Sequence, residues 1–390
     1  MSTMEEVPVD TQNEFLLWAS CGSSELLETL TAMRQVTKGR KFKAILQCVL
    51  LRSDGSLMVT DIDTQMIRLV FPWETVPSKD IAVNLEALLK ICKACKRKSM
   101  LFLEKDGVLK VVSNGCEFML ETCDAEEFPS NYDTSGELVC TIKEGGLQSK
   151  LKAVSYATDS EASRYALFGV LFESSADRAW YVASDGRRLA YADSAIRFYR
   201  PTEMIFPTTF IRALYAADPF GDATLFQRWG EPIPQPEGDP KQNLLGACVY
   251  VSDWCIVTRL CEGRFPRWRD VISSSPATNH IGFLTEDLRN GIERLCLNEP
   301  RWIDFIGCVR GVALSTSYSK SLVPTADATG LDIRLDGDFV LEFLKNCGAK
   351  RVHIEWADGE HAATFSSDSH YCLIMPLSNG REKPEAEASE

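Results

Sequence analysis

The sequence predicts an α+β fold in which one unit, built of two helices and several antiparallel strands, occurs three times. Segments with helical spacing of apolar residues alternate with short strand-like runs, and the order of these elements recurs along the chain. The dipeptide Phe-Pro closes each of the first two units, at Phe128-Pro129 and at Phe265-Pro266.

The length of 390 residues suits two to three ordinary domains. A stretch rich in proline, residues 229–246, is interpreted as a hairpin insertion in the second unit. The predicted boundaries are a flexible tail at 1–14, three units at 15–135, 136–275 and 276–379, and an acidic tail at 380–390.

In the first unit, helical spacing of Leu26, Leu30 and Met33 predicts a helix over residues 24–33. Asn84 can cap a second helix over residues 85–96, whose basic residues lie on a face other than the apolar one. The predicted strands are 44–51, 57–60, 66–71, 100–104, 108–113 and 116–122.

The second and third units repeat this order. Thr285 is interpreted as the cap of one helix, Gly348 as the C-terminal glycine of another, and residues 317–330 as a loop. The predicted helices are 147–156, 208–217, one starting at 285, and 338–347. The predicted strands are 166–173, 179–183, 248–252, 255–260, 305–309, 312–316, 352–356, 362–365 and 371–377.

The stretch 180–190 predicts a hairpin. Asp185-Gly186 is a strong turn signal, because glycine tolerates the positive φ that such turns need. Arg187 and Arg188 follow the turn and are expected at an exposed corner. On this pattern alone, a hairpin with solvated charges is a sufficient interpretation.

Composition favours a soluble globular protein, with 45% hydrophobic and 25% charged residues. No apolar run reaches the ~18–20 residues that a membrane span needs, and the polar N-terminus is unlike a secretory signal. A cytoplasmic protein without membrane partners is therefore expected. The fourteen cysteines are scattered through apolar patterns, so free thiols are expected, with no metal and no cofactor.

The net charge of −13 argues against a surface that binds nucleic acid all over. It leaves room for a local basic surface, so the distribution of lysine and arginine matters more than the sum.

Four stretches together resemble a known family, the bacterial sliding clamp, which is the beta subunit of DNA polymerase III. They stand in the matching order over residues 25–377. The four stretches are residues 164–173, residues 183–190, Glu262-Gly263-Arg264-Phe265-Pro266 and Ile374-Met375-Pro376-Leu377.

The resemblance implies three clamp domains per chain and a head-to-tail dimeric ring with helices lining the hole. It implies sequence-independent binding of double-stranded DNA, because phosphate contacts hold a duplex without reading its bases. The DNA-binding candidates are Arg40, Lys41, Lys43, Lys90, Lys93, Arg97, Lys150, Arg164, Tyr165 and Arg212, with Lys152, Arg289 and Lys345 as further basic residues. For any one lysine, a merely solvated helix face is the alternative.

The resemblance also implies a groove that binds a short, apolar peptide motif of partners. The expected partners are the polymerase III catalytic subunit, the clamp loader and other proteins with such a motif. The implied groove residues are Leu167, Ser184, Gly186, Arg187, Arg188, Leu189, Pro266, Val271, Leu373, Ile374, Met375, Pro376 and Leu377. Phe118, Leu120, Leu295 and Cys296 match the interface that closes the ring, with a core role as the alternative.

Two residues depart from the family pattern. Glu161 lies in a loop expected to contact DNA, and Asp270 lies beside the groove, where a basic residue is usual. The alternatives to a ring-forming clamp are a specialised or non-ring DNA-binding or scaffold protein of the same fold, and an enzyme acting on a small molecule. No Walker loop, GxSxG or HExxH motif supports an enzyme.

Overall fold

The computed structural model describes residues 15–38, 43–95, 98–131, 133–159, 166–199, 201–231, 243–273, 277, 279–296, 301–325 and 330–378. The chain divides into two compact units. Unit 1 comprises Met1–Gln148 and Thr209–Leu260, and unit 2 comprises Ser149–Thr208 and Cys261–Glu390.

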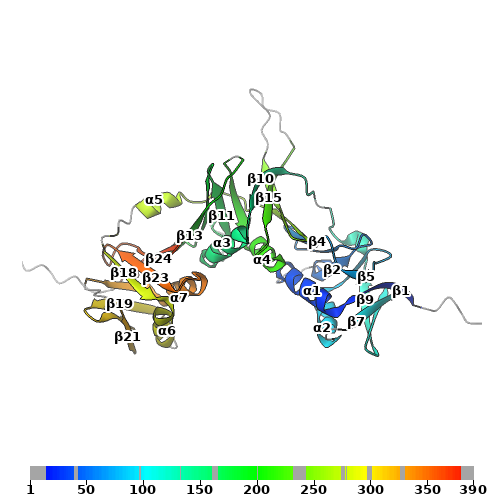
Figure 1. Cartoon of the computed structure of the whole chain (residues 1–390), viewed down its shortest axis with the longest axis horizontal. Helices are drawn as coiled ribbons and strands as arrows, with labels where there is room; N and C mark the ends of the chain where they lie inside the picture. The colour runs from blue at the N-terminus through cyan, green and yellow to red at the C-terminus, as the bar shows by residue number, and fades with distance from the viewer. Residues whose placement is uncertain are drawn as a thin grey trace, which may run out of the picture. The chain divides into compact units, whose positions relative to one another are not determined.

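Unit 1 is built on a 13-stranded antiparallel sheet of order β10-β15-β16-β17-β4-β3-β2-β6-β9-β8-β7-β1-β5. Helices α1 (Ser23–Thr37) and α2 (Leu85–Cys95) lie side by side, and α1 packs on β3 and β4 (Figure 1). Helix α4 (Thr208–Ala217), whose first residue belongs to unit 2, and the short η1 (Ala44–Gln47) and η2 (Ala125–Glu127) complete the unit. The strands are β1 (Leu16–Gly22), β2 (Cys48–Leu51), β3 (Leu57–Thr60), β4 (Thr64–Arg68), β5 (Trp73–Thr75), β6 (Ile81–Asn84), β7 (Ser99–Lys105), β8 (Val108–Ser113), β9 (Cys116–Cys123), β10 (Glu137–Ile142), β15 (Ala223–Trp229), β16 (Leu244–Val251) and β17 (Trp254–Arg259).

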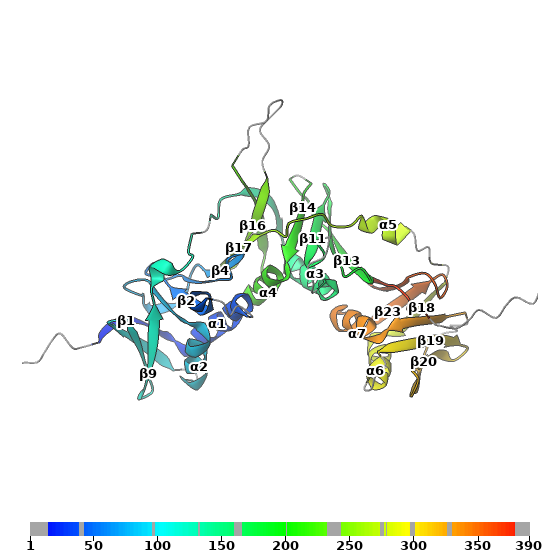
Figure 2. The same cartoon turned by 180° about the vertical axis from the view of Figure 1, so that it is seen from behind.

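Unit 2 contains an 8-stranded sheet of order β14-β11-β12-β13-β25-β24-β23-β18 and a 4-stranded sheet of order β21-β20-β19-β22. Helices α6 (Thr285–Leu295) and α7 (Gly337–Asn346) pack against each other (Figure 2). The other helical segments are α3 (Gly146–Val154), which begins in unit 1, η3 (Ser155–Ala157) and α5 (Trp268–Ser273). The strands are β11 (Gly169–Ser174), β12 (Arg178–Ser184), β13 (Arg188–Ala195), β14 (Glu203–Pro207), β18 (Asn279–Leu284), β19 (Trp302–Cys308), β20 (Gly311–Ser315), β21 (Lys320–Pro324), β22 (Asp332–Asp336), β23 (Arg351–Trp356), β24 (Ala363–Ser367) and β25 (His370–Ile374). The mixture of helices and antiparallel sheets confirms the predicted α+β class.

Local signals explain where several helices begin and end. Leu26, Leu30 and Met33 are fully buried on one face of α1, as their spacing predicts. Asn84 caps α2, since its side-chain oxygen accepts a hydrogen bond of 2.9 Å from the backbone N–H of Ala87. Gly348 follows α7 with φ of 66°, a conformation that glycine adopts without strain.

Three local predictions are wrong. Residues 44–47 of the predicted strand 44–51 form the short helix η1, and only Cys48–Leu51 is a strand. Thr285 does not cap α6, because its hydroxyl donates to the carbonyl of Ala349 (2.7 Å) and no side chain caps this helix. The predicted loop 317–330 contains β21, which pairs with β20. For residues 229–246, the antiparallel pairing of Trp229 in β15 with Leu244 in β16 agrees with the predicted hairpin; residues 232–242 lie outside the described residues, so the insertion stays a prediction.

All fourteen cysteines are free thiols, as the sequence predicts. Among the described residues, no helix combines the length and apolar character needed to cross a membrane.

Candidate functional site

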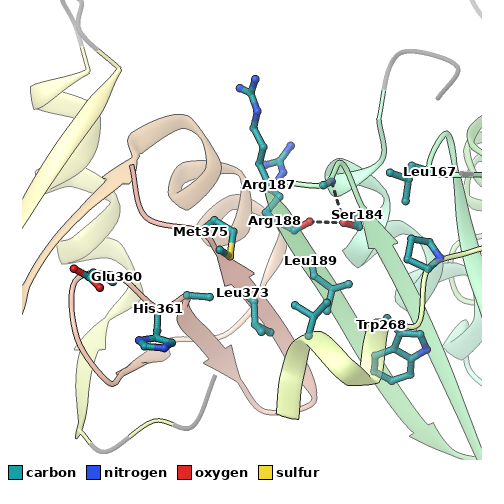
Figure 3. Close-up of a pocket in the computed structure, with 14 residues that line it drawn as sticks. Leu167, Ser184, Arg187, Arg188, Leu189, Trp268, Glu360, His361, Leu373 and Met375 are labelled. Atoms are coloured by element: carbon teal, nitrogen blue, oxygen red, sulfur yellow. Dashed lines mark hydrogen bonds between the residues drawn. The ribbon is translucent and has the colours of Figure 1, made fainter. Parts of the chain in front are cut away.

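A pocket of about 600 Å³ lies within unit 2 and is lined mainly by apolar side chains. We call it the groove. Its wall comes from the β12–β13 hairpin, the end of β25 and helix α5 with the loop before it (Figure 3). The predicted groove residues that line it are Leu167, Ser184, Gly186, Arg187, Arg188, Leu189, Pro266, Val271, Leu373 and Met375.

The floor of the groove is an apolar cluster. Leu189 of β13 lies directly opposite Leu373 of β25 in the antiparallel register. Both side chains pack with Leu167, Phe265 and Trp268 in one buried cluster. Because four segments far apart in sequence, around residues 167, 189, 265–268 and 373, pack together here, the floor forms without a ligand.

The rim of the groove exposes apolar surface. The side chain of Met375 is 48% exposed, and its backbone N–H donates to the carbonyl of Arg187 (3.0 Å). Val271 of α5 is also exposed beside the groove. Exposed apolar residues around an apolar hollow are typical of a binding surface.

The predicted Asp-Gly turn is confirmed, and its own side chains hold it. Gly186 has φ of 84°. The carboxylate of Asp185 accepts from the backbone N–H groups of Arg187 (2.9 Å) and Arg188 (3.0 Å). The hydroxyl of Ser184 donates to the carbonyl of Arg188 (2.7 Å), so the corner of the groove is fixed before any ligand arrives.

Three predicted groove residues do not line the pocket. Ile374 is fully buried and follows Leu373 on the strand, so it faces the other side of the sheet. The chain then leaves the groove at Pro376, and the backbone N–H of Leu377 donates to the carbonyl of Arg334 (2.9 Å). Successive side chains of a strand point to opposite faces of the sheet, so consecutive residues of β25 cannot all line the groove.

Sequence reasoning missed four lining residues, namely Trp268, Glu360, His361 and Ala362. Trp268 is buried, and its indole N–H donates to Glu173 (3.0 Å). The sequence signal for Trp268 was its place two positions after Pro266, but the short α5 has no clear helical pattern. The ring of His361 holds the pKa of Asp358 down at about 2, so this carboxylate beside the groove stays charged.

Arg188 corrects the prediction of two arginines at an exposed corner. Arg187 is exposed, but the side chain of Arg188 is only 6% exposed and bonds to Asp185 and Glu342. Burial alone would lower the pKa of Arg188, whereas the hydrogen bond and charge of Glu342 raise it. The ion pairs are the physical reason that this charge can leave water.

Asp270, which departs from the expected basic residue, lies on α5 with its carboxylate 3.4 Å from the guanidinium of Arg267. Both side chains are largely exposed, so the pair adds little stability but leaves no lone negative charge at this position.

No family model matches the chain. Curated relatives do match. The beta sliding clamp of Escherichia coli strain K12 is 27% identical over 384 residues, covering 90% of this chain and 97% of the relative. The beta sliding clamp of Vibrio cholerae is 22% identical over 373 residues, covering 91% and 98%.

Solved structures show the same fold. The DNA polymerase III beta subunit of Thermotoga maritima superposes with a TM-score of 0.79 at 17% identity, covering 93% of this chain and 99% of that one. The sliding clamp of Pseudomonas aeruginosa bound to griselimycin gives a TM-score of 0.77 at 21% identity, over 93% and 99%. The chain is therefore similar to beta sliding clamps over 90% of its length, and it shares their fold.

Several residues implied for DNA contact in a beta sliding clamp lie outside the described residues: Arg40, Lys41, Arg97, Arg164 and Tyr165, with Glu161. Lys90 and Lys93 are exposed on α2, away from its buried face of Leu88 and Cys92. Lys43 and Arg212 are exposed too. These positions permit phosphate contact, which stays a prediction.

Lys150 is placed differently from the other basic candidates for a clamp. It is half-buried, and its ammonium donates to the hydroxyl of Ser369. Burial lowers the pKa of Lys150, although the charges of Asp193 and Asp368 oppose this shift. Its neighbour Lys152 is exposed and is the better placed of the two for phosphate.

The implied interface residues of the clamp divide into two pairs. Phe118 and Leu120 share one face of β9 and are half-buried. Leu295 is 4% exposed within its own unit, so it has little area left for a partner, and Cys296 beside it is half-buried. Contact of Phe118 and Leu120 with Leu295 and Cys296 of a second copy stays a prediction.

Proposed function

We propose that this chain is a DNA sliding clamp that encircles duplex DNA and tethers the replicative polymerase for processive synthesis. The observation that carries this proposal is the likeness to beta sliding clamps over 90% of the chain. Such a clamp is a processivity factor and not an enzyme, since it performs no chemistry itself. We expect it in the cytoplasm, where a bacterial replication clamp works.

The physical task of the clamp is to stay on DNA while moving along it. Lysine and arginine side chains attract phosphates and release counterions, without reading base edges. The exposed basic residues on α2 and α4 suit this role, namely Lys90, Lys93 and Arg212. A net charge of −13 keeps the rest of the surface repulsive to DNA.

The groove is proposed to bind a short linear peptide with bulky apolar side chains. An apolar floor with a preformed polar corner at Ser184 and Asp185 would seat such side chains and orient the peptide backbone. Met375 adds a flexible, polarisable contact that adapts to different partners. The proposed partners are the polymerase III catalytic subunit, the clamp loader and other proteins with this motif.

The ring is proposed to form from two copies joined head to tail, each with three clamp domains at residues 15–135, 136–275 and 276–379. The open edge of β9 supports this proposal. β9 pairs with β8 along its length but with β6 only at Thr122 and Cys123, so between Cys116 and Glu121 one edge has no strand partner among the described residues. Such an edge is available for pairing with another chain.

Self-association tests the proposed ring. Sedimentation equilibrium should give a mass of twice 43.5 kDa. Phe118→Asp should shift the protein to monomers, because a carboxylate in an apolar interface loses its hydration without gaining a partner. Phe220→Asp is the matched control, since Phe220 is 80% exposed in a loop of the same unit.

A wild-type protein that stays monomeric at micromolar concentration would favour the alternative of a clamp-fold DNA-binding or scaffold protein that forms no ring. A dimer that survives Phe118→Asp would place the interface elsewhere.

A further inference from the structure

We propose that Glu342 on α7 is a positioning residue for the groove and acts through Arg188. The inference rests on the proposed function of the groove as a peptide site. Glu342 does not line the groove, yet its carboxylate holds the guanidinium of a residue that does.

The guanidinium of Arg188 is held from three sides. Its Nε donates to Asp185 (3.0 Å), one terminal nitrogen donates to Glu342, and the other donates to the carbonyl of Tyr156 (2.9 Å). The ring centroid of Phe339 lies 4.1 Å from the guanidinium carbon, and that of Tyr156 lies 5.3 Å away. Arg188 thus ties the hairpin turn to η3 and to α7.

This arrangement leaves the guanidinium little capacity to bind a ligand. The side chain of Arg188 is 6% exposed, and each of its three guanidinium nitrogens already donates one hydrogen bond within the fold. Arg188 therefore shapes the groove by holding the wall in place, and we assign no direct guanidinium contact to the peptide.

Backbone hydrogen bonds of Arg187 and Arg188 connect the anchored Arg188 side chain to the surface of the groove. The carbonyl of Arg188 accepts from Ser184 (2.7 Å), and the carbonyl of its neighbour Arg187 accepts from the backbone N–H of Met375 (3.0 Å). A shift of the Arg188 side chain would therefore move both the polar corner and the methionine rim.

Glu342 is the part of this arrangement that can be changed with least harm to folding. Its side chain is 46% exposed, whereas Arg188 and Phe339 are packed within the contact. Removing its charge leaves a buried guanidinium with one anionic partner, Asp185, which favours rearrangement of the wall. We expect Glu342→Gln to weaken peptide binding about tenfold while the protein stays folded.

The test measures binding of a fluorescently labelled peptide that carries the apolar motif of the cognate polymerase. The variants are Glu342→Gln, Arg188→Lys and both together. Glu293→Gln is the control, because Glu293 is exposed on α6 and the charge change is the same. If Glu342 acts through Arg188, the double variant should bind no more weakly than Arg188→Lys alone.

If Glu342 only stabilised the fold, Glu342→Gln would lower the free energy of unfolding in urea. Its effect on peptide affinity would then be independent of the effect of Arg188→Lys. Wild-type affinity in Glu342→Gln, or a double variant whose loss is the product of the two single losses, would overturn the inference. Met375→Asp is the reference variant. Loss of binding in this variant shows that the peptide occupies the groove. A wild-type protein that does not bind the peptide would overturn both proposals.

Discussion

Replacing Met375 with aspartate is expected to weaken binding of the polymerase-derived peptide by at least about 100-fold. An apolar peptide side chain would seat against Met375 and the Leu189–Leu373 floor, so the new carboxylate would lose its hydration without a partner. Met375 is 48% exposed in the free protein, so the same change should alter the free energy of unfolding little.

Fluorescence anisotropy with the labelled peptide measures this effect. Leu284→Asp is the matched control, since Leu284 is 49% exposed in unit 2 and does not line the groove. Met375→Ala should weaken binding about tenfold, because it removes contact area without adding charge. Equal affinity of Met375→Asp and wild type would show that the peptide binds elsewhere.

Acidification is expected to destabilise unit 2 through His370. Its side chain is 5% exposed, and neither ring nitrogen has a hydrogen-bond partner among the described residues. The ring packs against those of Phe343 and Tyr156, at centroid distances of 5.1 and 6.0 Å. Burial, followed by the charge of Lys150, lowers the pKa of His370 to about 4 from the usual 6.5.

The direction of the pH effect follows from the pKa of His370, which is about 4 in the native protein and 6.5 in the unfolded chain. Between pH 6.5 and 4 the unfolded chain holds a proton on His370 that the native protein lacks, so the free energy of unfolding falls with falling pH. The shift corresponds to about 3 kcal/mol over this window. Urea unfolding at pH 7 and pH 4 measures the loss.

His370→Leu should show a smaller loss between these pH values, because the apolar side chain has no proton to bind. His280→Leu is the control, since it makes the same substitution at an exposed histidine of unit 2. An identical pH dependence in wild type and His370→Leu would contradict a buried neutral imidazole.

Elements whose signals are local could be predicted from sequence. The spacing of Leu26, Leu30 and Met33, the cap at Asn84 and the glycine after α7 all act within one or two turns of helix. The turn at Asp185-Gly186 is equally local. For these elements the residues that decide the structure are neighbours in the sequence.

Elements decided by distant pairing were missed. β21 has the polar composition of a loop and becomes a strand because it pairs with β20. β1 pairs with β7, a strand some eighty residues later, and no strand is predicted for residues 16–22. Pairing partners of this kind leave no mark in the local pattern.

The same limit applies to the groove. The family resemblance predicted most of the residues that line the groove. Glu360 and His361 line it because of how the chain folds, and no sequence motif marks them. The pattern suggested that Arg188 is solvated like Arg187. Its burial depends on Glu342, 154 positions further along the chain, which no local rule could supply.

Retention on circular DNA tests the proposed ring most directly. After loading onto nicked circular DNA and gel filtration at moderate salt, the protein should remain with the circle, and it should dissociate when one restriction cut makes the DNA linear. A ring that surrounds the duplex predicts this dependence on the ends of the DNA. Equal retention on circular and linear DNA, or none on either, would contradict a topological link.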